Sequence, residues 1–295
     1  MPVRTEAVMG TLVTIHVVRP SADADSAIDR AFGWFYEIEE RCTRFDPQSE
    51  LMQLTAQAGR PVAASPILYE AVRFALMVAE ESGGAFDPTV GQRMEARGFN
   101  REHRTGEIVH TTITGDDDVS YRDVELDAHR KTIMLLRPLT LDLGGVAKGL
   151  AVDTAARELE SFQDFAIDAG GDLYLGGRNP QGASWTVGIR HPRPAEGDVQ
   201  AIIESLRISN QAVCTSGDYE RRTHILDPRT QTPSDSVASA TVVAPSAMLA
   251  DALATAAFVL GPEEGIEFLT RLGVEGLIVT PDLKRRETRG LCRAA

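Results

Sequence analysis

The side chains best suited to chemistry in this chain of 295 residues lie in two segments that are far apart in the sequence. In "LDLGGVAKG", Asp142 precedes a Gly-Gly pair and Lys148 follows it. In "ADALAT", Asp251 and Thr255 are four positions apart within an otherwise apolar segment. An acid, two glycines and a lysine before a helix are typical of a phosphate-binding turn. A carboxylate beside a hydroxyl can offer oxygen ligands to a hard cation.

The segment that holds Asp251 and Thr255 is predicted to be a buried helix. Every other residue from 247 to 260 is apolar, and a helix that is apolar on all sides belongs in the interior. Residues four apart share one helix face, so the two polar side chains should be neighbours. A buried aspartate needs a partner. The sequence therefore leaves two interpretations: an acid that caps a loop or pairs with an arginine, or a cation site.

The "LDLGGVAKG" segment is also open to two interpretations. Gly144 and Gly145 let a ligand approach the main chain, and the helix expected from about Ala147 would present free N–H groups to it. Lys148 adds a positive charge for a phosphate, and Asp142 could hold a hydroxyl or an amide. A Gly-Gly pair between a strand and a helix is also the mark of a tight structural turn.

Three further segments combine glycines with polar side chains. "ESGGAFDPTVG" ends a helix and continues into a turn that contains Phe86 and Asp87, whereas "AIDAGGDLYLGG" is best explained as a tight hairpin. "VCTSGDYERRTHILDPRTQTP" holds His224, which is either a hydrogen-bonded structural residue or a catalyst. The sequence has no G-x-S-x-G element and no Cys–His arrangement, so it does not support a hydrolase triad.

The composition excludes some functions. A net charge of −13 opposes a broad nucleic-acid surface, which requires clustered Lys and Arg. The three cysteines have no metal-ligand spacing, and the "DDD" at residues 116–118 is expected to be a solvated surface run. Neither a signal-peptide core nor a membrane-spanning apolar run is present. We therefore expect a soluble cytoplasmic protein, with an exported form whose leader has been removed as the alternative.

The pattern of apolar residues predicts an α+β fold, with mixed or antiparallel sheets packed against helices. The N-terminal half is predicted to hold a strand over residues 8–18, helices over 21–45 and 65–84, a short helix within 45–59 and loops over 92–125. Further strands are expected over residues 131–143, 164–177, 184–192, 201–217, 223–228, 237–245 and 274–280, and helices over 147–161, 246–261 and 262–273. With neither a linker nor a repeat, residues 5–290 are predicted to form one domain, followed by a tail at 291–295.

These motifs occur together in an order that resembles one family. The array "MGT … RFDPQSEL … GGAFDPTVG … LDLGGVAKGLAVD … AGGD … TSGDYERR-x-H-I-L-D-P-R-T … VASATVVAPSAMLADALATA" is similar to the ApbE family of FAD:protein FMN transferases. The resemblance implies an ApbE-like, T-fold-related domain that binds FAD and Mg²⁺. It also implies transfer of the FMN moiety of FAD to a Ser or Thr hydroxyl of an acceptor protein, with release of AMP.

The resemblance also implies roles for individual residues. Asp251, Thr255 and the carbonyl of Gly145 match the metal ligands, and His224, together with Asp251, matches the catalytic residues. Positions that match the FAD-contacting residues of the family are Met9, Phe45, Ala85, Phe86, Asp87, Asp142, Lys148, Thr215 and Ile225. A Mg²⁺-dependent FAD pyrophosphatase and a non-catalytic flavin-storage protein are the two alternatives.

Three features of this chain depart from the family pattern. Phe45 replaces a tyrosine that many relatives have, which keeps a ring for stacking but removes a hydroxyl contact. Gln231 replaces the glycine of the usual "DP-x-TG" element, which bears on the conformation of that loop. Most relatives are exported, and the sequence given has no export signal.

Overall fold

The computed structural model describes residues 3–103, 105–111, 118–195, 197–198, 200–219 and 225–294. Its main element is an eight-stranded sheet in the order β1-β2-β6-β7-β10-β13-β14-β15, with antiparallel neighbours throughout. The strands are β1 (Val3–Val8), β2 (Thr11–Val17), β6 (Phe165–Ala169), β7 (Asp172–Gly176), β10 (Gln211–Gly217), β13 (Ser239–Ala244), β14 (Glu275–Val279) and β15 (Arg285–Glu287).

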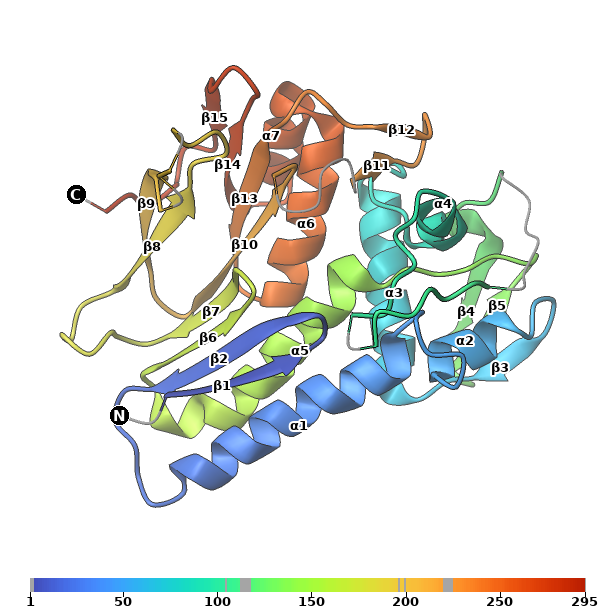
Figure 1. Cartoon of the computed structure of the whole chain (residues 1–295), viewed down its shortest axis with the longest axis horizontal. Coiled ribbons are helices and arrows are strands. Elements are labelled where there is room, and N and C mark those ends of the chain that lie inside the picture. Colours follow the sequence, from blue (N-terminus) through green and yellow to red (C-terminus); the bar gives the residue numbers. More distant parts are fainter. Residues whose placement is uncertain are drawn as a thin grey trace.

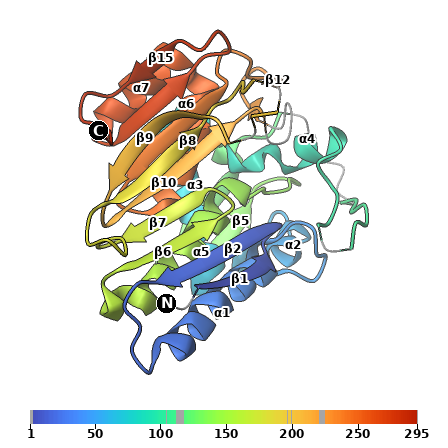
Figure 2. The same ribbon diagram turned by 60° about the vertical axis from the view of Figure 1, so that its left-hand side comes forward.

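Four helices cover one face of this sheet (Figure 1). They are α1 (Ala24–Cys42), α5 (Gly144–Leu159), α6 (Ala247–Leu260) and α7 (Pro262–Arg271). The hairpin of β8 (Trp185–Arg190) and β9 (Ile202–Ile208) crosses the other face, as Figure 2 shows. Alternate residues of a strand point to opposite faces, so Val242 of β13 joins the core under the helices and Val243 joins a second core under the hairpin.

A smaller group of elements lies beyond α3 (Pro66–Glu81), away from the large sheet (Figure 1). It contains the antiparallel sheet of β3 (Pro61–Ala63), β5 (Thr132–Leu135) and β4 (Val124–Asp127), with helices α2 (Glu50–Thr55) and α4 (Gly91–Ala96). Short 3-10 turns span Pro88–Val90, Tyr121–Asp123 and Glu160–Phe162, and β11 (Leu226–Asp227) pairs with β12 (Thr232–Pro233).

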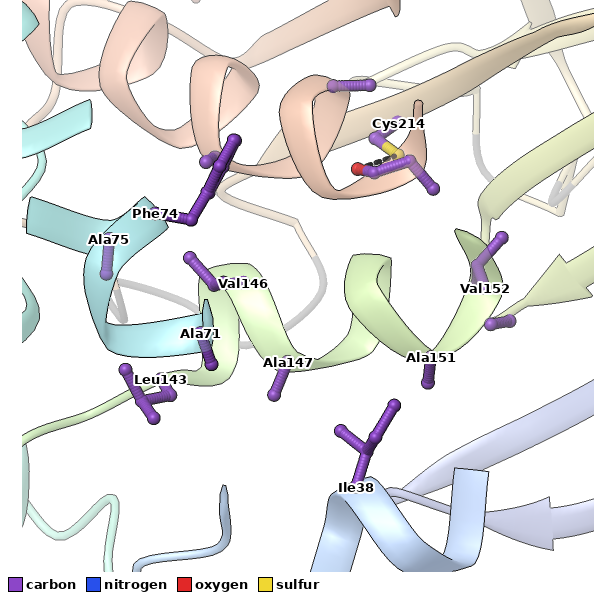
Figure 3. Packing of buried hydrophobic residues seen from close by; sticks show 14 of the residues in the cluster. Ile38, Ala71, Phe74, Ala75, Leu143, Val146, Ala147, Ala151, Val152 and Cys214 are labelled. Atoms are coloured by element: carbon purple, nitrogen blue, oxygen red, sulfur yellow. Dashed lines mark hydrogen bonds between the residues drawn. The ribbon is translucent and has the colours of Figure 1, made fainter. Parts of the chain in front are cut away.

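The centre of the molecule is helix α5, which packs between α1, α3 and α6 (Figure 3). Its contact with α6 is very close at Gly149, because a Cβ there would lie 2.4 Å from the Cα of Met248. A larger residue at this position would push the two helices apart. The sequence therefore fixes the spacing of the two helices that carry Lys148 and Asp251.

The structure confirms the α+β class and corrects several predicted elements. Residues 8–18 are not one strand, because Met9 and Gly10, at φ of 53° and 72°, form the turn between β1 and β2. A turn that contains Asn210, also at positive φ, divides the strand predicted over 201–217 into β9 and β10. The short strands β3, β4 and β15 were not predicted.

The segment before the Gly-Gly pair is also not the predicted strand. Strand β5 ends at Leu135, and the backbone of Thr140 and Asp142 bonds to the 3-10 turn at Pro88–Val90 and to the start of α4 instead of to a sheet. Asp142 N donates to Pro88 O at 2.7 Å, and Gly91 N donates to Thr140 O at 3.1 Å. Buried leucines at alternate positions gave the strand pattern, although the segment only lines the helical core.

The last residues of the chain extend the β8–β9 hairpin. Arg207 N donates to Cys292 O at 2.9 Å, and Ala294 N donates to Ser205 O at 2.8 Å. The single-domain boundary at residues 5–290 stays a prediction, although the predicted tail is bonded to β9. Within the described residues, no helix combines the length and apolar character needed to cross a membrane. Of the predicted acidic run, Asp118 is exposed and residues 116–117 lie outside the described part.

Candidate functional site

A cavity of about 590 Å³ opens at the end of the large sheet where the β1–β2 turn, the start of α5, the end of β10 and the middle of α6 meet. Its volume lies within the range of roughly 300–1,000 Å³ that is typical of ligand sites. Every predicted site residue that the structure describes lines it: Met9, Phe45, Ala85, Phe86, Asp87, Asp142, Gly145, Lys148, Thr215, Ile225, Asp251 and Thr255. The predicted catalytic residue His224 lies outside the described residues.

Asp251 is a buried carboxylate without a complete set of partners. Its residue is only 8% exposed, and among the described residues its Oδ2 has no hydrogen-bond partner. The nearest charge is the Lys148 ammonium, 3.6 Å from Oδ2. Within the described part of the chain, the Asp251 carboxylate neither caps a loop nor pairs with an arginine, the two roles that the sequence left open besides a cation site. The carboxylate thus retains an oxygen for a further ligand.

Thr255 and Gly145, the other two predicted metal ligands, lie close to each other in the same cavity. The Thr255 hydroxyl is 3.2 Å from the hydroxyl of Ser216, at the end of β10. A Cβ added to Gly145 would lie 3.7 Å from Thr255 Oγ1 and 3.0 Å from the Phe86 ring. One carboxylate, one hydroxyl and one carbonyl suit Mg²⁺, which usually keeps several waters or phosphate oxygens as its remaining ligands. The residues present therefore fit this ion.

The described residues contain no group of three or more His, Cys, Asp or Glu side chains suited to hold a metal. A site with a single carboxylate agrees with this, because its other ligands are neutral oxygens. Such a site gains much of its affinity from the phosphate that binds with the ion.

Lys148 is held between two acids, one of which the sequence did not indicate. Its ammonium makes an ion pair with Asp172, which is 3% exposed, and it also lies near Asp251. The prediction that "AIDAGGDLYLGG" forms a hairpin is correct, since β6 and β7 pair directly. Yet Gly170 and Asp172 of this hairpin also line the cavity. Asp172 therefore belongs to the site as a partner of Lys148.

Asp142 is engaged by the protein itself. Its Oδ1 accepts the N–H of Gly144 at 2.8 Å, and its Oδ2 accepts the Nε–H of Arg44 at 2.7 Å. Asp142 therefore links Arg44 to the first turn of α5, and its predicted contact with FAD stays a prediction. Arg44 also lines the cavity and was not predicted.

Asp153 holds the start of α6 against α5. Its carboxylate accepts the backbone N–H groups of Ala247 at 2.6 Å and Met248 at 3.0 Å. Burial raises the pKa of Asp153, and the two N–H groups act in the opposite direction. Asp251 is one turn further along α6, so Asp153 helps to place it. Asp153 stands in the "GLAVD" part of the motif, but the sequence gave no sign of its partner.

A buried aromatic side chain, that of Phe86, forms part of the cavity wall. Phe86 is 6% exposed, and Asp87 beside it accepts the N–H and hydroxyl of Thr89 at 2.9 and 2.7 Å and the N–H of Tyr121 at 3.0 Å. Burial raises the pKa of the Asp87 carboxyl, and these donors act against that change. Asp87 thus fixes the loop that carries Phe86 and Ala85.

Thr215, Ile225 and Pro228 reach the cavity from strand β10 and from a loop. The Thr215 hydroxyl is 2.8 Å from the Thr241 hydroxyl of the neighbouring strand. Ile225 and Pro228 come from the loop that leads to Gln231, whose φ is +61°. This left-handed conformation explains why a glycine suits the position of Gln231 in the family pattern.

Comparisons with known proteins show the family of this chain. The ApbE family model matches residues 9–278. An FAD:protein FMN transferase of Treponema pallidum is 33% identical over 98% of this chain and 87% of its own length. The FAD:protein FMN transferase of Vibrio cholerae is 32% identical over 88% of this chain and 81% of its own.

Solved structures show the same fold. The ApbE protein of Thermotoga maritima has a TM-score of 0.85 and 28% identity, and the alignment covers 98% of this chain and 97% of that one. The flavin transferase ApbE from Vibrio cholerae has a TM-score of 0.83 and 26% identity, with 97% and 96% coverage. The fold and enzyme class that the sequence predicted are those of these relatives. The chain belongs to the ApbE family.

Proposed function

We propose that this protein is an FAD:protein FMN transferase that needs Mg²⁺ and modifies a Ser or Thr hydroxyl of an acceptor protein. The observation that carries the proposal is the convergence of Asp251, Thr255, Gly145 and Lys148 at one end of a single cavity. The curated relatives carry this enzyme name. Phe45 and Phe86 add aromatic surface for a ring of FAD.

Asp251, Thr255 and the carbonyl of Gly145 would hold the metal ion. When bound, Mg²⁺ would offset the charge of the diphosphate and polarise the attacked phosphorus. This need is pronounced in a protein of net charge −13. Ser216 would orient the Thr255 hydroxyl through its hydrogen bond, and Asp153 would fix the helix that carries Asp251 and Thr255.

Lys148 and the first turn of α5 would bind the diphosphate. The ammonium of Lys148 is held by Asp172, which keeps it at the cavity instead of in solvent. The start of α5 adds the positive end of a helix dipole. Positioning and charge stabilisation supply most of the catalysis in phosphoryl transfer, so rigid placement of these groups is the main contribution of the protein.

The bonds made and broken follow from the products. The acceptor hydroxyl oxygen attacks the phosphorus of the FMN half of FAD, and the bond from that phosphorus to the bridging oxygen breaks. The electron pair of this bond leaves with AMP, and the hydroxyl proton passes to a base. Our candidate base is His224, whose ordinary pKa near 6.5 suits proton transfer at neutral pH.

One assay distinguishes the proposal from its two alternatives. The protein is incubated with FAD, Mg²⁺ and a candidate acceptor bearing a Ser/Thr flavinylation motif, and flavin fluorescence in a gel and AMP are measured. A fluorescent acceptor with AMP supports the transferase. AMP with free FMN would instead identify a pyrophosphatase, and neither product would identify a storage protein. In the same assay, a His224→Ala variant that transfers FMN at the wild-type rate would exclude His224 as the base.

A further inference from the structure

We propose that Arg44 is a positioning and recognition residue for the bound dinucleotide, an inference that rests on the proposed function. Its guanidinium holds the Phe45 ring and the Asp142 carboxylate in place. It also presents a free N–H donor to an oxygen of FAD. Arg44 follows α1 directly and lies among the residues that line the cavity.

The burial of Arg44 is unusual for a charged side chain. The residue is only 8% exposed, whereas arginine is almost never fully buried unless it is paired. Removing a guanidinium from water is unfavourable unless its donors are satisfied. A buried arginine in a cavity wall therefore needs a set of acceptors on that wall.

The protein supplies acceptors for two of the three guanidinium nitrogens. Nε donates to Asp142 Oδ2 at 2.7 Å, and Nη2 donates to the carbonyl of Phe99. The carbon of the guanidinium lies 4.3 Å from the centroid of the Phe45 ring. Because Asp142 also accepts the N–H of Gly144, Arg44 is linked to the first turn of α5. Phe99 lines the cavity as well.

The third nitrogen, Nη1, has no hydrogen-bond partner among the described residues. Among the described residues, the partners of the Arg44 hydrogen bonds and ring contact all line the same cavity: Phe45, Phe99 and Asp142. A donor left over on a planar guanidinium suits a carbonyl, hydroxyl or phosphate oxygen. A dinucleotide in this cavity offers all three kinds of acceptor.

The contact with Phe45 adds a second consequence. A guanidinium over one face of the ring leaves only the opposite face for a ligand ring, which fixes the stacking direction. The hydroxyl that many relatives have at this position is absent from Phe45. Arg44 thus orients the phenylalanine through its face, and a lysine could not do so with the same planar fork.

The test compares Arg44→Lys, Arg44→Gln and Arg44→Ala with the wild type. FAD affinity is measured by quenching of flavin fluorescence, the KM for FAD and kcat are measured in the transfer assay, and stability is measured by urea unfolding. Arg41→Ala is the matched control: Arg41 pairs with Glu37 at 3.0 Å and Glu50 at 3.3 Å and is not among the described residues that line the cavity.

We expect Arg44→Lys to weaken FAD binding and raise the KM for FAD by about tenfold or more, because a charge-assisted bond is lost. The kcat should change less than the KM, as for an interaction made equally in the ground and transition states. Arg41→Ala should keep the wild-type affinity.

An Arg44→Lys protein that is less stable but binds FAD within about twofold of wild type would reduce Arg44 to a structural support and overturn the inference. If Arg44→Ala does not fold, Arg44→Lys and Arg44→Gln still decide the question. If the wild type binds FAD and transfers FMN, and the Arg44 variants match its FAD affinity and KM, only this inference is wrong. A wild type that binds no FAD defeats the proposed function as well.

Discussion

At the scale of single residues, the site depends on charges whose partners are remote in the sequence. Lys148 lies between Asp172 and Asp251, and Asp142 is held by Arg44. The sequence indicated Asp251 and Lys148, because an acid in an apolar helix and a lysine after two glycines are local patterns. It did not indicate Asp172 or Arg44, because their partners are set by the tertiary fold.

Asp251→Asn should abolish metal-dependent AMP release from FAD. The amide keeps the shape of the side chain but removes the only carboxylate in the proposed ligand set. Folding should be retained, because the substitution removes a buried charge whose closest cation, the Lys148 ammonium, is 3.6 Å away. The two readouts are AMP release with and without Mg²⁺ and urea unfolding. If metal-dependent turnover persists in a folded variant, the proposed ligand set is incorrect.

Ser216→Ala should weaken Mg²⁺ binding by about tenfold, because groups that orient metal ligands typically contribute tenfold to a hundredfold. The hydroxyl removed is the one that lies 3.2 Å from Thr255 Oγ1. Calorimetric titration with Mg²⁺ in the presence of FAD measures the effect. Thr270→Ala serves as the control, since its exposed hydroxyl donates to Ile266 O within α7, away from the cavity residues. Unchanged affinity in Ser216→Ala would show that Thr255 needs no such support.

At the scale of secondary-structure elements, the site depends on the fit of α5 against α6. Gly149 allows the close approach, and Asp153 ties the first turn of α6 to α5. The sequence predicted both helices, because their apolar patterns are long. It gave α5 a start near Ala147, whereas the helix begins at Gly144. The hydrogen bond from Gly144 N to Asp142, which brings the two glycines into the first turn, is a feature that periodicity does not report.

Asp153→Ala should lower the free energy of unfolding by about 1–2 kcal/mol, the usual effect of losing a helix cap. Two N–H groups at the start of α6 lose their acceptor. Urea unfolding followed by circular dichroism gives the value, and Asp25→Ala on the exposed first turn of α1 is the control. Equal destabilisation by both changes would mean that the link from Asp153 to α6 adds no more to the free energy of unfolding than an exposed acid does.

At the scale of the whole molecule, one helical layer and one hairpin bury the two faces of a single sheet. The sequence predicted the α+β class from its mixture of strands and helices. It did not separate β1 from β2 or β9 from β10, although Gly10 and Asn210 are of types common in turns, because apolar and β-branched residues continue on both sides of each turn. The order of the strands depends on pairings between distant segments, such as β2 with β6, and these leave no local pattern.

The burial of the cysteines gives a simple test of this packing. Burial raises the pKa of Cys42 to about 12 and that of Cys214 well above its ordinary value, whereas Cys292 is exposed. The thiolate is the reactive form, so a thiol reagent at neutral pH should label one cysteine in the native protein and three in urea. Rapid native labelling of Cys42 or Cys214 would contradict the core described above.

We propose that Asp251, Thr255 and Gly145 hold a metal ion beside FAD in one cavity. Crystals soaked with FAD and Mn²⁺ test it directly through the anomalous scattering of manganese. We expect an anomalous peak in contact with the Asp251 carboxylate, the Thr255 hydroxyl and the Gly145 carbonyl, next to the diphosphate of FAD. A peak elsewhere, or FAD bound outside this cavity, would contradict it.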